Sequence, residues 1–193
     1  MDEVVKSIMI GSILGDGFLD KPTRNGSRLT IKYDDKSITY LKWLHKKLAN
    51  FGVSEIKKKR GYHQHYFSTK PSFETAYLRN VFYPSGKKII PFDIQKILNN
   101  PISLAVWYMD DGSLDYRLKY HRNASIATFC FSYKDCELLA KTLKVNFGVE
   151  ARVHLSTMRG KKYYRLYITS KSFNDFMKLI KPYINPCMRY KTL

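Results

Sequence analysis

Two apolar stretches with helical spacing stand out, one in each half of the chain. The first covers about 2–15 and leads into Asp16 and Gly17, and the second covers about 101–110 and leads into Asp111 and Gly112. Asn100 and Pro101 are typical of a helix start, because Asn caps the first turn and Pro fits its first position. We therefore expect two helices that each bring a carboxylate to their C-terminal end, 95 residues apart.

The pattern around these helices repeats in the same order. We expect paired strands and amphipathic helices in each half, at about 17–20, 27–33, 41–51, 54–60, 63–69 and 71–81, then at 113–117, 124–131, 138–147, 150–156, 163–169 and 171–181. Asn25-Gly26, Arg60-Gly61 and Arg159-Gly160 mark turns between strands. The predicted fold class is α+β: a duplicated αββαββα unit with two antiparallel sheets. A linker near 84–100 divides it into halves 1–97 and 98–193.

Alternation along the strands separates an apolar face from a basic one. Leu29 and Ile31 share one face, whereas Arg28, Thr30 and Lys32 point to the other. The apolar face should pack on the helices, and a basic antiparallel sheet is able to enter the major groove of DNA. The alternative is that the polar face is an ordinary solvated surface.

Charge favours the first interpretation. Lys and Arg exceed Asp and Glu by 34 to 16, giving a net charge of +18, and each half carries +9. Such a charge resists compaction unless a polyanion binds, so nucleic acid is the first expected partner and an anionic membrane the second. The chain has no apolar run of about 20 residues, and its three cysteines lack metal-ligand spacing. We expect an intracellular, soluble protein.

Candidate DNA-contacting residues lie mainly on the predicted basic faces and turns. They are Arg28, Thr30, Lys32, Lys57, Lys59, Arg60, His63, His65, Arg122, Arg152, His154, Arg165 and Tyr167. The run from Lys57 to Arg60 is either a phosphate clamp or a solvated turn. His63 and His65 share one strand face, where DNA contact or plain exposure is favoured over a metal site.

The two Asp-Gly sequences carry the candidate chemistry. If the apolar helices pack side by side, Asp16 and Asp111 meet at the same end of the seam. Small residues such as Gly11 and Gly15 permit that approach. Two carboxylates at helix C-termini repel each other unless a cation lies between them, and carboxylate and carbonyl oxygens suit Mg²⁺. A single Asp-Gly could instead begin a turn, but the duplication favours a shared site.

Taken with the motif from Trp107 to Ser113, these features resemble the LAGLIDADG homing endonucleases, in particular intron-encoded ones with two motifs in one chain. The resemblance covers essentially the whole chain. It implies a DNA-binding saddle, a monomer, and a staggered cut through both strands of a long site. It also implies two or three divalent ions, Mg²⁺ with Mn²⁺ as a substitute, bound by the Asp16 and Asp111 carboxylates and the Gly15 and Asp110 carbonyls.

The resemblance further implies a lysine near each scissile phosphate. Lys191 is the candidate in the second half, and Lys87 or Lys88 in the first, of which we select Lys87. Cys130 lies near where a polar site residue is often found. One departure is that Val106 occupies the position equivalent to Gly11.

Two other functions stay open. The same fold could serve as an RNA maturase, with the protein's own intron RNA as partner, or as a DNA-binding protein that does not cleave. An unrelated basic RNA-binding protein would show neither metal dependence nor double-strand cutting. Because both Asp16 and Asp111 are present, a site-specific double-strand DNA endonuclease is the main hypothesis.

Overall fold

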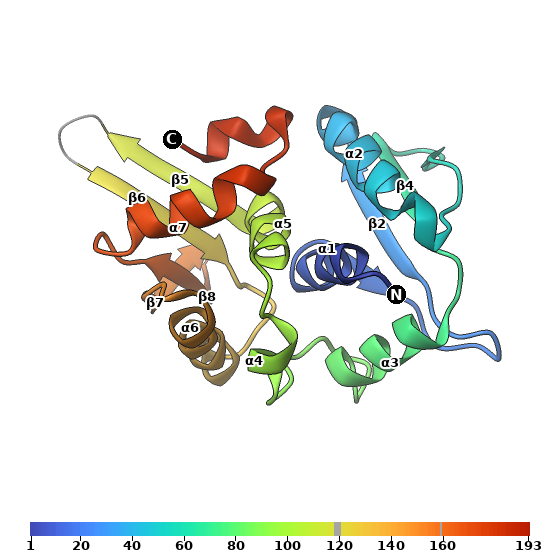
Figure 1. Cartoon of the computed structure of the whole chain (residues 1–193), viewed down its shortest axis with the longest axis horizontal. Helices are drawn as coiled ribbons and strands as arrows, with labels where there is room; N and C mark the ends of the chain where they lie inside the picture. The colour runs from blue at the N-terminus through green and yellow to red at the C-terminus, as the bar shows by residue number, and fades with distance from the viewer. Residues whose placement is uncertain (118–120, 159) are drawn as a thin grey trace.

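The computed structural model, which describes residues 1–117, 121–158 and 160–193, contains two four-stranded antiparallel sheets. Their strand orders, β1-β2-β4-β3 and β5-β6-β8-β7, are the same when counted within each half. The central pair of helices, α1 (Glu3–Leu14) and α5 (Pro101–Asp111), lies between the sheets (Figure 1). The predicted duplicated αββαββα fold is confirmed.

The first half contains short strands and helices of about ten residues. After α1 they are β1 (Phe18–Leu19), β2 (Leu29–Asp34), α2 (Ile38–Leu48), β3 (Lys57–Lys58), β4 (Gln64–Ser68) and α3 (Phe73–Phe82). Single-turn 3-10 helices cover Asp35–Ser37 and Ala49–Phe51. The predicted strand at 54–60 is thus reduced to β3, although the N–H groups of Ser54 and Lys59 on either side of it still donate to the Ser68 and Gln64 carbonyls of β4.

The second half has longer strands. After α4 (Ile94–Ile97) and α5 come β5 (Gly112–Arg117), β6 (His121–Ala127), α6 (Tyr133–Phe147), β7 (Ala151–Met158), β8 (Lys161–Ile168) and α7 (Phe173–Ile180), with 3-10 turns at Lys181–Tyr183 and Pro186–Lys191. The strand predicted to reach residue 131 ends at Ala127. A turn precedes Ser132, which begins α6 with a reciprocal capping box to Asp135.

The central helices approach closely because a small residue on one faces a larger residue on the other. A Cβ at Gly11 would lie 2.5 Å from the Ser103 carbonyl oxygen and 2.7 Å from Val106 Cβ. Val106 and Gly11 occupy equivalent positions in their helices, so they face each other across the pseudo-twofold axis. The bulky Val106 therefore fits the space that Gly11 leaves.

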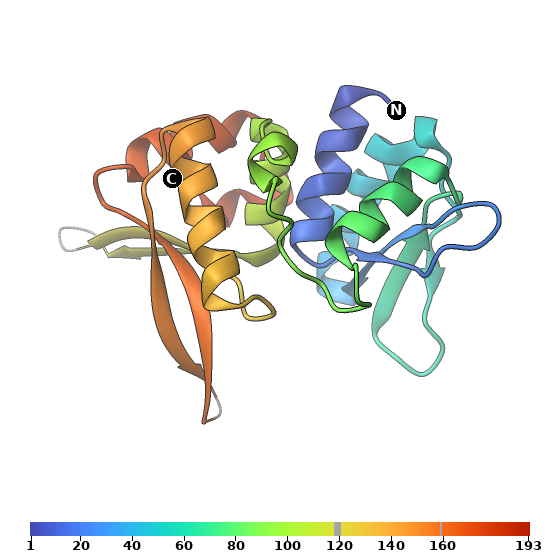
Figure 2. The same ribbon diagram turned by 90° about the horizontal axis from the view of Figure 1, so that it is seen from below.

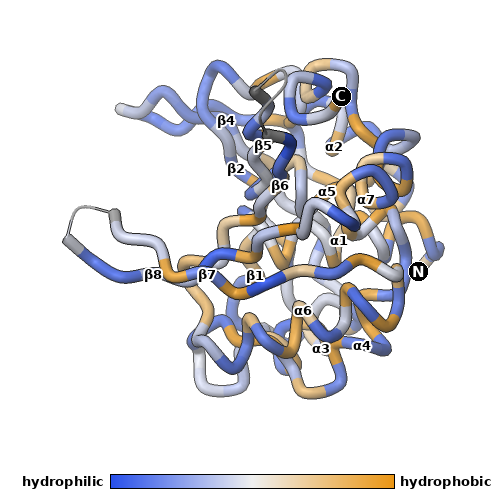
Figure 3. The backbone as a smooth tube through the Cα atoms, turned by 90° about the vertical axis from the view of Figure 1, so that its left-hand side faces the viewer, coloured by the Kyte–Doolittle hydropathy of each residue, from blue (hydrophilic) through white to orange (hydrophobic). Residues whose placement is uncertain are grey.

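Two hairpins extend from the same side of the molecule, one from each half (Figure 2). Hydrophobic positions concentrate in the central helices, whereas the hairpins are largely hydrophilic (Figure 3). Gly61 and Gly160 form their turns with φ of +76° and +75°, a region that favours glycine. Arg159, predicted beside Gly160, lies outside the described residues.

The connection between the halves is partly helical. Within the predicted linker, α4 packs on α6 of the second half, and the Asn146 side-chain amide donates to the Gln95 and Leu98 carbonyl oxygens. The division at residue 97 therefore falls in a segment whose neighbours belong to the second half. The short helix escaped prediction because Pro91 and the preceding Ser85-Gly86 dominate the local pattern.

Candidate active site on the pseudo-twofold axis

Asp16 and Asp111 lie at the C-terminal ends of the two packed helices. Gly15 ends α1 by donating its N–H to the Gly11 carbonyl, and Asp16 follows it. Asp111 is the last residue of α5, and the N–H of Gly112 donates to the Tyr108 carbonyl. Because α1 packs on α5, the two helices lie side by side between the sheets (Figure 1). The charge of Asp16 acts on the Asp111 carboxyl, so the two acidic side chains share one site near the axis that relates the halves.

A lysine amino group binds the backbone carbonyls at each of these helix ends. Lys88 Nζ donates to the carbonyl oxygens of Ile13, Gly15 and Gly17 at 2.7, 2.9 and 3.2 Å. The final carbonyls of a helix lack partners within the helix and carry partial negative charge, which a cation stabilises. Burial lowers the pKa of Lys88.

The second half repeats this arrangement with Lys191. Its Nζ donates to the carbonyl oxygens of Met109 and Asp110 at 2.5 and 3.2 Å. The Lys191 carbonyl in turn accepts a 2.9 Å hydrogen bond from the Tyr108 hydroxyl, which ties the C-terminal 3-10 turn to α5. Burial lowers the pKa of Lys191 as well.

The structure corrects the choice between Lys87 and Lys88. The Lys87 side chain is exposed, whereas Lys88 points to the end of α1. Adjacent residues after α3 point in different directions, and only the path of the chain back toward α1 selects between them. Lys88 is therefore the first-half counterpart of Lys191 in position.

Burial and mutual repulsion raise the pKa values of the paired carboxyls. The pKa of Asp111 is raised to about 7 by burial and by the charge of Asp16, while Lys88 and Lys191 oppose the shift. Burial also raises the pKa of Asp16, against the effects of Lys88, Lys191 and Lys32. Opposite charges close to a carboxylate favour its ionised form. The two lysines thus offset part of the cost of placing two acids on one axis.

Asp110 has a different environment from its neighbour Asp111. Its Oδ1 accepts hydrogen bonds from the hydroxyls of Tyr33 and Tyr40 at 2.6 and 3.0 Å, and its Oδ2 accepts from the Asp16 N–H at 3.2 Å. Burial and the charge of Asp16 raise the pKa of Asp110 well above its usual range. No pattern in the sequence indicates that these tyrosines reach Asp110, because they lie about 75 residues away from it.

The oxygen atoms at the helix ends fit a divalent cation whose coordination shell is completed by water and substrate. Among the residues that the structure describes, no group of three His, Cys, Asp or Glu side chains is arranged to hold a metal. Asp16 and Asp111 supply two carboxylates, and the Gly15 and Asp110 carbonyls lie beside them at the helix ends. Mg²⁺ commonly binds one or two carboxylates, with water and substrate phosphate as its other ligands.

Cross-strand partners identify the residues that share the polar sheet faces. In the first sheet Lys32 pairs with Tyr66, which pairs with Lys57. In the second sheet Arg152 pairs with Tyr167, and His154 with Arg165. By this register and by strand alternation, the polar faces carry the predicted contact residues Arg28, Thr30, Lys32, Lys57, Lys59, Arg152, His154, Arg165 and Tyr167, with Arg60 exposed at the first hairpin turn.

Three predicted contact residues lie elsewhere. His65 pairs with Tyr33, on the face opposite Lys32, and both His65 and His63 lie beside Asp35 at 3.1 and 3.2 Å. Arg122 has the strand parity of Ala124 and Ile126, which are buried under the helices. By register His63 and His65 follow the Tyr33 face, and Arg122 lies in β6, which begins earlier than the predicted strand. Contact of these three residues with DNA therefore stays a prediction that the basic sheet faces do not support.

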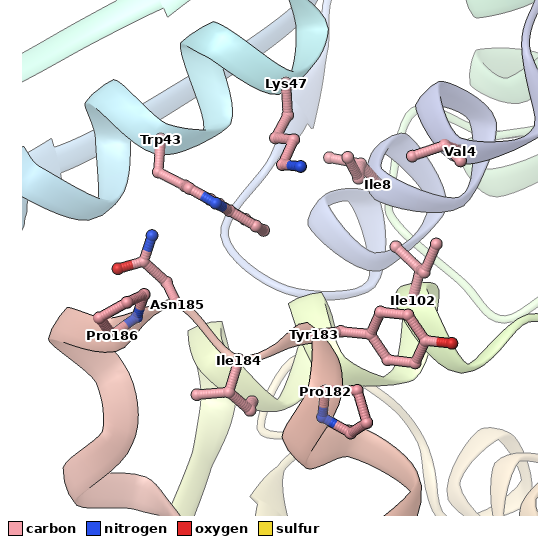
Figure 4. A pocket seen from close by; sticks show the side chains of 10 residues that line it. All are labelled: Val4, Ile8, Trp43, Lys47, Ile102, Pro182, Tyr183, Ile184, Asn185 and Pro186. Atoms are coloured by element: carbon pink, nitrogen blue, oxygen red, sulfur yellow. The ribbon is translucent and has the colours of Figure 1, made fainter.

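A separate hollow lies at the opposite ends of the central helices (Figure 4). It is lined mainly by apolar groups, including Ile8 of α1, Trp43 of α2 and Ile184 after α7. Lys47 is the one charged side chain among its described lining residues, so the hollow offers no carboxylates for metal chemistry. In the described part of the chain, no helix combines the length and apolar character needed to cross a bilayer.

Fold and site together define a class of protein: a pseudosymmetric two-motif chain with one paired-carboxylate site on its axis and two basic sheet faces. The model of the LAGLIDADG DNA endonuclease family matches residues 6–176. The chain belongs to this family, which confirms the resemblance seen in its motifs.

Solved structures with the same fold include two that contain DNA. The homing endonuclease I-WcaI bound to its DNA recognition sequence matches with a TM-score of 0.82 and 25% identity, covering 100% of this chain and 87% of the other. I-DmoI in complex with DNA and Mn matches with a TM-score of 0.56 and 21% identity, covering 92% and 96%. The second match supports the fold alone.

A relative with another named role is similar over nearly the whole chain. The cytochrome b mRNA maturase bI2 of Saccharomyces cerevisiae is 29% identical over 204 aligned residues, covering 97% of this chain. The chain spans about half of that maturase, 47% of its length. The chain is thus similar to a relative named for RNA processing as well as to structures named as endonucleases.

Proposed function

We propose that this protein is a site-specific endonuclease that hydrolyses one phosphodiester bond in each strand of a long duplex DNA site. The observation that carries the proposal is the equivalent placement of Asp16 and Asp111 on one axis, each beside a lysine that binds helix-end carbonyls. The two strands of a DNA duplex are related by an approximate twofold axis. Two carboxylates related by a similar axis are therefore suited to cutting one bond in each strand.

Binding would use the polar sheet faces. Their cationic side chains, such as Lys32 and Arg165, match both the phosphates and the acceptors on base edges. Lys32 is close enough to Asp16 to lower the pKa of that carboxyl, so the first basic face adjoins the candidate site. The net charge of +18 favours a duplex polyanion. We infer that residues 1–97 and 98–193 each bind one half of the DNA site and that a single chain suffices.

The oxygens around the axis are suited to divalent ions such as Mg²⁺ or Mn²⁺. The carboxylates of Asp16 and Asp111 would hold them, with the carbonyls of Gly15 and Asp110 beside them. Bound ions of this kind activate water and stabilise the leaving oxygen. Lys88 and Lys191 keep the helix ends in place and set positive charge next to both carboxylates, where a phosphodiester would bring further negative charge.

A maturase function is the second candidate, and the similarity to the yeast mRNA maturase favours it. In that case the basic surfaces would bind the protein's own intron RNA, and catalysis at the aspartates would not be required. The two functions make different predictions for the same variants, because only cleavage depends on both carboxylates.

The deciding experiment is selection of cleaved products from a randomised duplex library with Mg²⁺ or Mn²⁺, followed by assay on a plasmid that carries the selected site. The protein should linearise that plasmid, and EDTA should stop the reaction. Asp16→Asn and Asp111→Asn should each slow cleavage by on the order of 10³-fold while binding in Ca²⁺ is retained. Normal double-strand cleavage by either variant contradicts the shared site. Splicing assistance without any cleavage supports the maturase.

A further inference from the structure

The Asp110 side chain is directed into the opposite half of the molecule. It belongs to α5, yet the three hydrogen-bond donors to its carboxyl come from the first half: Tyr33 on β2, Tyr40 on α2, and the backbone N–H of Asp16. Tyr40 is fully buried, and the Tyr33 and Tyr40 rings lie 5.2 Å apart. Packed rings fix both hydroxyls, so the position of the Asp110 carboxyl is well determined.

The Asp16 amide depends on this carboxyl because it lies beyond the end of α1. Gly15 N–H bonds to the Gly11 carbonyl and Gly17 N–H to the Ser12 carbonyl, at 3.0 and 2.6 Å. The amide between them turns away from the helix and donates to Asp110 Oδ2. By contrast, Asp111 is itself a residue of α5, so the helix holds its backbone.

The arrangement has no counterpart on the other side of the axis. Gly15 is the residue equivalent to Asp110, and it has no side chain that could reach the backbone of Asp111. A Cβ at Gly15 would overlap the Asp110 carboxyl. One motif therefore supplies the carboxyl, and the other leaves space for it.

We propose that Asp110, held by Tyr33 and Tyr40, is a positioning residue that fixes the backbone of Asp16, and that it therefore affects the two strand cuts unequally. The inference rests on the proposed endonuclease function. The pseudo-twofold axis relates Asp16 to Asp111 and one DNA strand to the other. A change that displaces only Asp16 consequently breaks the equivalence of the two cuts.

The test compares cleavage of supercoiled plasmid by the wild-type protein and by Asp110→Ala. Loss of the hydrogen bond should slow one cut about tenfold relative to the other, so nicked circles accumulate before linear product. A loss of folded protein would lower both cuts equally and leave their ratio unchanged. Tyr33→Phe and Tyr40→Phe should shift the ratio in the same direction by less, and they keep the test valid if Asp110→Ala does not fold.

Conservative and control variants sharpen the result. Asp110→Asn should restore the ratio, because its amide oxygen accepts from Asp16 N–H while its NH₂ donates to the tyrosine oxygens. Tyr83→Phe, which removes the hydroxyl of another buried tyrosine of the first half, should leave the ratio unchanged. Equal slowing of both cuts by Asp110→Ala protein that is fully folded overturns the proposal.

A second measurement separates this inference from the function on which it rests. Hydrogen exchange at the Asp16 amide should become faster in Asp110→Ala, while exchange at the Asp111 amide stays as in the wild type. Unchanged exchange at Asp16 refutes the positioning role, whether or not the protein cleaves DNA. If the wild type fails to cleave DNA while the Asp16 amide still exchanges faster in the variant, the endonuclease function and the unequal strand cuts are refuted. The same result supports the role of Asp110 in positioning the Asp16 backbone.

Discussion

The ends of α1 and α5 are equivalent in topology but differ in how each aspartate is held. Lys88 binds three carbonyls at the end of α1, whereas Lys191 binds two at the end of α5. Asp16 follows its helix and is hydrogen-bonded to Asp110 of the other motif, whereas Asp111 is the last residue of its own helix. The repeated motif thus provides two equivalent positions with unequal supports.

The difference follows a rule of complementary size. At two equivalent positions α1 carries glycine, Gly11 and Gly15, and α5 carries larger residues, Val106 and Asp110. Each glycine leaves space for its larger counterpart. A homodimer cannot do this, because both of its helices have the same sequence. A single chain with two motifs is free to assign the small residues to one helix and the large ones to the other.

The largest stability effect should come from enlarging the small side of this contact. Gly11→Ala places a methyl group 2.5 Å from the Ser103 carbonyl oxygen, so we expect a loss of about 3 kcal/mol in the free energy of unfolding, measured in urea. On helix propensity alone the same change would stabilise by about 1 kcal/mol. The sign of the effect therefore decides whether packing or propensity controls this position.

The neighbouring Ser12 supplies a matched control. Ser12 is fully buried in the same helix, and its hydroxyl has no hydrogen-bond partner among the described residues. Ser12→Ala should leave stability unchanged or slightly raised, because it removes an unpaired polar group. If Gly11→Ala is as stable as Ser12→Ala, close approach of the helices is not what requires glycine.

The second prediction distinguishes the lysines by their contacts. Lys88→Met should slow cleavage roughly 10- to 100-fold, the range seen when a group that supports metal ligands is removed. Lys87→Met makes the same change of charge one residue away, on an exposed side chain, and should change the rate by less than about twofold. Single-turnover rates measure both, and equal effects would mean that only net charge matters.

The third prediction compares the two aspartates through pH. The pKa of Asp111 is raised to about 7, against about 4 in an unfolded chain. The folded protein therefore retains a proton that the unfolded chain releases, and stability from this group is lost as the pH rises from 4 through 7. In EDTA at pH 7.5, Asp111→Asn should be more stable than the wild type by up to about 4 kcal/mol, and at pH 4 by almost nothing.

Asp16→Asn provides the comparison for that effect. The pKa of Asp16 is also raised by burial, and its charge contributes to the shift of Asp111. The gains of the single variants should therefore sum to more than the gain of the double variant, because each removes part of the same repulsion. A gain that is equal at pH 4 and pH 7.5 would exclude ionisation as its cause.

The sequence was sufficient for the features that repeat. Two apolar helices ending in Asp-Gly, with alternating strands after each, predicted the duplicated fold and the pairing of Asp16 with Asp111. Periodicity identified the basic face of β2, because the buried residues Leu29 and Ile31 alternate along the strand with the polar residues Thr30 and Lys32. These features depend on local pattern, and the pattern in each half supports the interpretation of the same pattern in the other half.

The features that break the repeat depend on tertiary contacts. Lys88 and Lys87 are both basic residues after α3, and only the return of the chain to α1 selects between them. Tyr33 has the parity of the apolar face, and strand alternation alone does not show that its hydroxyl donates to Asp110, 77 residues away. Arg122 lies outside the predicted strand at 124–131, and only the earlier start of β6 at His121 shows which face of the sheet it follows.

The smallest expected effects concern the sheet faces and test whether the halves bind DNA equally. Lys32→Ala and Arg165→Ala should each weaken binding and lower the slope of log affinity against log salt by about 1, if each neutralises one phosphate. Arg122→Ala removes the same charge from the opposite face and should change the slope by less than half as much. Fluorescence anisotropy with the selected duplex at several salt concentrations measures all three.

The β7–β8 hairpin pairs over eight residues, whereas β3–β4 pairs over two. Because the longer hairpin presents more of its polar face, Arg165→Ala should weaken binding more than Lys32→Ala does, although each lowers the salt slope by about 1. A larger loss of affinity in Lys32→Ala would mean that the first half binds the DNA more tightly.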